Sequence, residues 1–194
     1  MKEQDTHQAI DDKAAPMASA PMRYREDGEV DWGNMWDSFC VLAREGGPPH
    51  RATMLLPEED SQIEAETYNK VVHEIVRGIK EVSGYEAEPV EPGWIAVKCQ
   101  SPEMARWLAE AIVMENVQAG HSIRDGKLLL VPAGAHYTLK GEIKNVVTAV
   151  AKTTHYWREH LSPDVKTALR AEGGLAEIKR RITSFFRRDK ATAH

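Results

Sequence analysis

The stretch YEAEPVEPGWIAVKCQ, residues 85–100, decides the fold class of this chain. It contains two strand-like runs on either side of Glu91-Pro92-Gly93, a turn in which glycine supplies a permissive backbone. The second run, Trp94–Cys99, is rich in the aromatic and β-branched residues that favour strands. The stretch therefore predicts two consecutive strands joined by a tight turn.

A helix is predicted on each side of these strands. Before them, Ser61 and Glu64 have the spacing of a capping box, and Gly84 ends the apolar pattern that follows. After them, Ser101 and Pro102 mark a helix start with proline at the first helical position. The residues expected to face inward are Tyr68, Val71, Val72, Ile75, Ile79 and Val82 in the first helix, and Met104, Leu108, Ala111 and Ile112 in the second.

Two further strand regions complete the pattern. Arg51–Leu56 is a short strand-like run closed by Pro57. Asp125-Gly126, between Ser122–Arg124 and Lys127–Val131, is a strong hairpin signal. From 51 to 131 the elements are strand, helix, strand, strand, helix, strand. This order predicts an α+β fold with a ferredoxin-like split βαβ antiparallel sheet.

N-terminal and C-terminal helices are expected to flank this core. Asp31 can cap a helix over 32–45, which the run Gly46–Pro49 ends, and a last helix over 139–161 carries one apolar face. Both helices should cover an end or the other face of the sheet. The residues expected in the main core are Trp36, Ile75, Ile112 and Val147.

We divide the chain into a disordered leader (1–22), an α+β domain (23–161) and a basic amphipathic C-terminal tail (162–194). The leader has acidic residues and no apolar region of a secretory signal. The apolar runs are shorter than the roughly 20 residues that a spanning helix requires. We therefore expect a cytoplasmic protein.

Composition and motifs exclude several classes. The chain is 42% hydrophobic and 28% charged, as ordinary globular proteins are, and Cys40 and Cys99 are expected to be reduced thiols. His155 and His160 are out of phase on a helix, and no zinc spacing, nucleophile elbow or phosphate loop occurs. We therefore predict no catalytic residue and no metal ligand. The cofactor is unknown, and a site assembled from Cys99 with His121 or His136 stays an open alternative.

The loop Glu45–Arg51 is the most unusual local feature. Two glycines and two prolines place His50 and Arg51 just before a strand, where an imidazole and a guanidinium can meet an anionic group. The alternative is a loop that only connects. The candidate ligand-binding residues, lining a pocket between the sheet and the flanking helices, are His50, Arg51, Trp94 and His136.

Charge is distributed unevenly. Residues 58–91 contain ten acidic and three basic residues, a net charge of −7, whereas residues 166–194 contain eight basic and three acidic residues, a net charge of +5. This separation permits the tail to fold back on the acidic helix, to dock on a neighbouring subunit, or to bind an external anion.

The tail has helical periodicity after Gly173-Gly174, with basic residues beside an apolar stripe. Such a helix is typical of partner-docking peptides and membrane-surface anchors. The plain alternatives are a terminal helix packed on its own domain and a solvated, disordered tail. The candidate partner-binding residues are Ile178, Arg180, Arg181, Ile182, Phe185, Arg187 and Arg188.

These patterns predict a non-enzymatic cytosolic binding or adaptor protein that engages a protein partner, or a second copy, through the C-terminal helix. One alternative is a small-molecule sensor or small enzyme that uses the predicted pocket. Another is a peripheral binder of anionic membranes or nucleic acid through the tail, although the overall net charge of −5 disfavours nucleic-acid binding elsewhere.

Overall fold

The computed structural model describes residues 22–36, 51–58, 65–122 and 126–172. These belong to two compact units, and the boundary between the units lies after Glu159. Nearly all of the predicted leader and most of the helix predicted over 32–45 lie outside the described residues.

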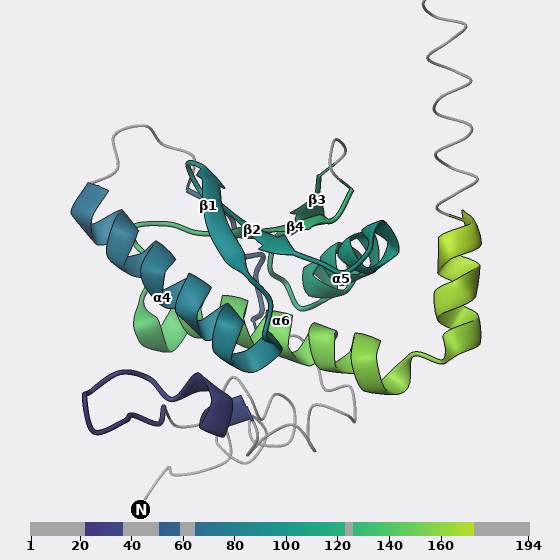
Figure 1. Cartoon of the computed structure of the whole chain (residues 1–194). Coiled ribbons are helices and arrows are strands. Elements are labelled where there is room, and N and C mark those ends of the chain that lie inside the picture. The colour runs from purple at the N-terminus through teal and green to yellow at the C-terminus, as the bar shows by residue number, and fades with distance from the viewer. Residues whose placement is uncertain (1–21, 37–50, 59–64, 123–125, 173–194) are drawn as a thin grey trace, which may run out of the picture. The chain divides into compact units, whose positions relative to one another are not determined.

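The first unit contains a four-stranded antiparallel sheet with the strand order β1-β2-β4-β3 (Figure 1). Its strands are β1 (Ala87–Glu91), β2 (Trp94–Lys98), β3 (Gly120–His121) and β4 (Leu128–Pro132). In the turn between β1 and β2, Gly93 has a φ of 83°, which glycine adopts without steric cost. The two strands predicted over 85–100 and the α+β class are confirmed.

The strand order differs from the ferredoxin-like order, so that topology is not confirmed. The predicted strand 51–56 contributes a single parallel bridge, between Leu55 and Val117, instead of a strand of the sheet. Arg51 Nε donates to the carbonyl of Thr53 at 3.0 Å, and this local contact accompanies a bend in the backbone. Strand β4 pairs with β2 on one side and with β3 on the other.

Local signals set the helix boundaries. In α5 (Pro102–Met114), Ser101 is the N-cap and its Oγ accepts the Met104 N–H at 3.3 Å. Helix α4 (Ala65–Ser83) ends before Gly84, as predicted. The helix predicted over 139–161 is present as α6 (Lys144–His155) with a π-helical turn at each end, η1 (Leu139–Ile143) and η2 (Tyr156–His160).

One face of the sheet forms the core with α4 and α5. Ile95 and Val97 lie opposite Val131 and Leu129 on the neighbouring strand, and none of these four side chains is exposed. Helix α4 lies against β1, and α5 lies against β3 and β4, on the same side of the sheet (Figure 1). Burying this face contributes hydrophobic stabilisation to the unit.

Helix α6 packs mainly on α4 and α5 and forms a further layer (Figure 1). This corrects the expectation that it covers an end or the other face of the sheet. At Gly78 a Cβ would lie 2.7 Å from Val147 Cγ2, so the missing side chain lets α4 and α6 approach closely. The core positions predicted at Trp36, Ile75, Ile112 and Val147 are all buried.

The segment 22–36 is fastened to α4 by a buried indole and several charges. The Trp32 side chain is fully buried, and its Nε1 donates to Glu74 Oε1 at 2.9 Å. Arg77 donates to Glu74 and Glu81 and to the carbonyl of Val30. These contacts make the segment part of the packed unit.

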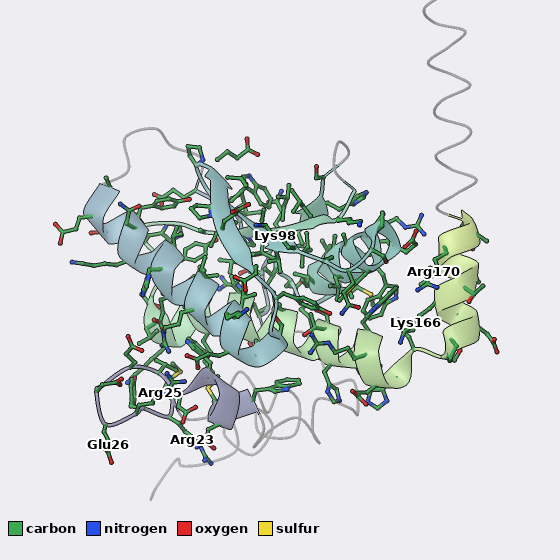
Figure 2. All side chains as sticks on the ribbon, viewed as in Figure 1. Arg23, Arg25, Glu26, Lys98, Lys166 and Arg170 are labelled. Atoms are coloured by element: carbon green, nitrogen blue, oxygen red, sulfur yellow. The ribbon has the colours of Figure 1, made fainter. Side chains whose placement is uncertain are left out.

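In the second unit, residues 163–172 form a helix that the sequence analysis did not assign. Its start repeats the pattern at α5, because Ser162 precedes Pro163 and accepts the Val165 N–H at 3.3 Å. Lys166 and Arg170 project from this helix (Figure 2). Basic side chains are therefore already present before residue 173.

Candidate functional site

Four segments meet at the end of the sheet where β4 stops. Glu58 N–H donates to the carbonyl of Ala133 at 3.0 Å, and Ala133 N–H donates to the carbonyl of Gly93 at 2.8 Å. Gly93 N–H in turn donates to the Tyr68 hydroxyl at 2.9 Å. A Cβ on Gly93 would lie 2.8 Å from the Glu58 carbonyl oxygen, so only glycine permits this approach. These contacts join the 51–58 segment to β4, the β1–β2 turn and α4.

The Glu58 carboxylate is bound by the loop that follows β4. Its Oε2 accepts the Ala135 N–H at 2.5 Å and lies 3.1 Å from His136 Nδ1. Burial acts to raise the pKa of Glu58, but the hydrogen bonds from His136 and Ala135 outweigh it and lower the pKa. Glu58 is therefore ionised at neutral pH and helps to hold the loop in place.

His136 combines an anchored nitrogen with an exposed ring. An ionised carboxylate only accepts hydrogen bonds, so Nδ1 is the nitrogen that donates to Glu58. The imidazole packs edge to face on Tyr137 with 4.9 Å between ring centroids, and 61% of the His136 side chain is exposed. The ring is oriented by two neighbours and remains accessible.

Tyr137 lies at the centre of the cluster. Its hydroxyl donates to the carbonyl of Leu56 at 2.6 Å. Burial raises the pKa of Tyr137 well above its ordinary value, the charge of Arg51 acts in the opposite direction, and Glu142 and Glu58 raise the pKa further. This hydroxyl is therefore a neutral donor that ties two loops together.

Arg51 and Glu142 face one another beside Tyr137. Arg51 Nη1 lies 3.7 Å from Glu142 Oε1, while Glu142 Oε2 accepts from both the N–H and the hydroxyl of Thr138 at 2.9 Å. Burial acts to raise the pKa of Glu142, but the hydrogen bonds from Thr138 and the charge of Arg51 outweigh it and lower the pKa. The two side chains thus carry opposite charges at neutral pH.

Two of the four predicted ligand-binding residues belong to this cluster. The charge of Arg51 acts to lower the pKa of Tyr137, and the His136 ring packs on the Tyr137 ring. Trp94 begins β2 next to Gly93 and lies opposite Pro132, half-buried. Strand alternation directs it to the face opposite Ile95, away from the core with α4 and α5. His50 lies outside the described residues, as do all the predicted partner-binding residues.

Sequence reasoning missed Glu58, Tyr137 and Glu142 as members of a site. Glu58 carries no local signal, because the Ala135 N–H that it binds is 77 positions further along the chain. Glu142 also carries no capping-box signal, because it lies four residues after Thr138 whereas a capping box has a spacing of three. Nothing in the local sequence indicates Arg51 as its neighbour.

Elsewhere in the described part of the chain, the Cys99 thiol is buried and the possible metal ligands are dispersed. Burial raises the pKa of the Cys99 thiol to about 11, so it is protonated at neutral pH. In the described ranges, no three or more His, Cys, Asp or Glu side chains are grouped to hold a metal ion. Among these residues, neither Cys99 with His121 nor Cys99 with His136 belongs to such a group, contrary to the alternative left open by the sequence.

Within the described segments, no helix has the length and apolar character to span a bilayer. Comparisons of the chain with protein-family models, with curated proteins and with solved structures find no match.

Proposed function

We propose that this chain is a cytosolic, non-enzymatic adaptor that engages an external protein partner through its basic C-terminal tail. The partner is expected to present an acidic surface with an apolar centre, which complements the basic residues and the apolar stripe of the tail. The observation that carries the proposal is the state of the acidic residues between positions 58 and 91.

Most of those acidic residues already have a partner. Of the seven in the described part of this stretch, six lie against a basic or histidine side chain, and Glu91 is the exception. The pairs are Glu58 with His136, Glu66 with Lys70, Glu74 with Arg77, Glu81 with Arg77 and Arg25, Glu86 with Lys80, and Glu88 with Lys98. Lys70, Arg77 and Lys80 are already included in the net charge of −7, and the fold adds Arg25 and Lys98 from outside the stretch. Part of the negative charge is therefore balanced without the tail.

This pairing bears on the three interactions that the charge pattern permits for the tail. They are folding back on the acidic helix, docking on a neighbouring subunit, and binding an external anion. Each exposed pair contributes little stability, about 0 to 1 kcal/mol, but it reduces the negative potential that would attract a basic segment. Folding back on α4 would compete with these local cations, and so would docking on a second copy with the same residues. An acidic surface on a different protein has no such competition.

The side chains described above argue against catalysis by the candidate site. Tyr137 commits its hydroxyl to a backbone carbonyl, and burial keeps the Cys99 thiol protonated. Glu58 has a lowered pKa and holds a loop, unlike a general acid, which needs a raised one. These groups stabilise the fold in the states that the structure gives them.

The test uses the full chain, tagged and recovered from its native cells. Ile182→Ser with Phe185→Ser removes apolar contacts, and Arg180→Gln with Arg181→Gln removes charge. Thr183→Ala with Ser184→Ala is the matched control, because it changes neither property of the same segment. We expect one stoichiometric partner with the parent and the control, and loss of at least about tenfold in affinity with each of the other pairs.

Thermal unfolding of each purified variant separates docking from bracing. An unchanged midpoint with loss of the partner supports the adaptor. A lowered midpoint without loss of binding contradicts it and makes the tail an internal brace. Self-association in sedimentation, or binding to vesicles that depends on anionic lipid and needs no protein partner, also contradicts it and favours a second copy or a membrane surface.

A further inference from the structure

Arg51 is anchored through both its backbone and its side chain. Its carbonyl accepts from Asn116 Nδ2 at 2.6 Å, and its Nε donates to the carbonyl of Thr53 at 3.0 Å. Asn116 follows α5 with a φ of 58°, and its own carbonyl accepts the Leu55 N–H at 2.8 Å. The guanidinium is therefore placed by contacts from two parts of the chain.

The two terminal nitrogens of Arg51 retain donors that the described part of the chain does not use. Nη1 lies 3.7 Å from Glu142 Oε1, which is beyond hydrogen-bond distance, and Nη2 has no hydrogen-bond acceptor there. The side chain is 21% exposed. Arg51 is therefore a mostly buried cation that solvent still reaches, and its terminal N–H groups can donate hydrogen bonds to a ligand.

The neighbours of Arg51 limit the charge of an incoming group. Thr138 donates two hydrogen bonds to the Glu142 carboxylate, and the pKa of Glu142 is lowered. A negative charge therefore stays beside the guanidinium at neutral pH. A phosphate dianion would be repelled by Glu142 more strongly than a monoanion. The Tyr137 hydroxyl donates its proton to the Leu56 carbonyl, so an anion at Arg51 is bound by the guanidinium and not by this hydroxyl.

We propose that Arg51 binds the carboxylate of a small organic acid through Nη1 and Nη2. A carboxylate matches the planar guanidinium with two parallel hydrogen bonds and carries a single charge. This site is independent of the adaptor function, because it involves no residue of the tail.

The test titrates the full chain with propionate, and separately with inorganic phosphate, at constant ionic strength. Nuclear magnetic resonance signals of the Asn116 side-chain amide and the Leu55 amide report on the surroundings of Arg51. We expect saturable shifts with propionate and at least about fivefold weaker binding of phosphate. Arg51→Gln should abolish the shifts, and Arg51→Lys should weaken binding about tenfold because lysine lacks the planar pair of donors.

Two further variants sharpen the result. Arg23→Gln is the matched control, because Arg23 is an exposed arginine that donates to Asn34 Oδ1 at 3.0 Å, and it should bind propionate as the parent does. Glu142→Gln removes the competing charge while keeping an acceptor for Thr138, so it should tighten propionate binding and narrow the gap to phosphate. If Arg51→Gln fails to fold, Arg51→Lys and Glu142→Gln still test the site.

Three outcomes would overturn the proposal. One is a propionate shift that does not saturate, which is the behaviour of an adventitious ion only. The second is an equal affinity of the parent for propionate and phosphate, which would show that the Glu142 charge does not discriminate between the two anions. The third is undiminished binding in Arg51→Gln or Arg51→Lys, which places the anion elsewhere.

Discussion

Lys152 Nζ lies 2.7 Å from Glu115 Oε1, and the two side chains are only 8% and 10% exposed. The pair joins α6 to the residue that caps the end of α5. Burial raises the pKa of Glu115, and the hydrogen bond and charge of Lys152 act to lower it. The attraction between the two groups thus offsets a cost of removing both from water.

Lys152→Met should destabilise the protein by about 3 to 5 kcal/mol, because it leaves the Glu115 carboxylate buried without the cation. The double variant Glu115→Gln with Lys152→Met should lose less, since neither change then leaves a buried charge. Urea unfolding at neutral pH measures both. A double variant less stable than Lys152→Met would contradict this explanation.

The cost of Lys152→Met should also depend on pH. Without Lys152, the pKa of Glu115 rises further above its value in the unfolded chain, so the folded state binds more protons at mildly acidic pH. Stability then rises as pH falls through the folded-state pKa toward the lower pKa of the unfolded chain. The difference in unfolding free energy between parent and variant should narrow on acidification from neutral pH, and a constant difference would show that Glu115 is not the titrating group.

Gly78→Ala should destabilise the protein by about 1 to 3 kcal/mol through overpacking. The added Cβ would lie 2.7 Å from Val147 Cγ2 and 3.1 Å from Trp32 Nε1. Gly33→Ala is the matched control, because a Cβ there meets no atom within 4 Å. Thermal unfolding should show a lower midpoint for the first variant and an unchanged or higher one for the second. Equal midpoints would mean that α4 and α6 can separate without cost.

Ile112→Ala should cost about 2 to 5 kcal/mol, because the side chain is completely buried and its removal leaves a cavity. The next residue on α5 supplies the comparison. Val113 is 38% exposed, and Val113→Ala should change the free energy of unfolding by less than about 1 kcal/mol. Denaturant unfolding of the two variants measures the difference, and similar losses would show that the inner face of α5 is assigned wrongly.

Glu58→Gln should remove part of the acid sensitivity of the fold. The pKa of Glu58 is lowered in the folded state, so its contribution to stability is present above the ordinary glutamate pKa and is lost as pH falls through the folded-state value. The parent should therefore exceed the variant in stability at neutral pH, and the two should converge in acid. Urea midpoints across this pH range test the prediction. A stability difference between parent and variant that grows in acid would contradict a lowered pKa of Glu58 in the folded state.

Short-range signals explain how much of the fold was visible in the sequence. Ser101 with Pro102, Gly84 and Gly93 each act on the backbone within a few residues, and the structure places helix ends or a turn at all of them. The apolar spacing likewise identified Ile75 and Ile112 as buried. None of these signals depends on a distant part of the chain.

The candidate site was visible only in fragments. Arg51 and His136 were chosen from residue type and local context, whereas Glu58, Tyr137 and Glu142 join them through contacts between segments far apart in sequence. The sequence of an acidic run does not show whether a given carboxylate faces water or binds a loop.

By itself, the sequence determined the end of α4, the start of α5, the β1–β2 turn and the buried faces of the two helices, because these depend on neighbouring residues. It did not determine that residues 51–56 form a single bridge instead of a strand of the sheet. The tertiary structure decided which buried faces meet. It placed β4 beside β2, set α6 against Gly78 of α4, and brought Lys152 to Glu115. An apolar stripe specifies that a surface must leave water, but the hydrophobic effect is non-directional, so close packing of the whole chain selects its partner.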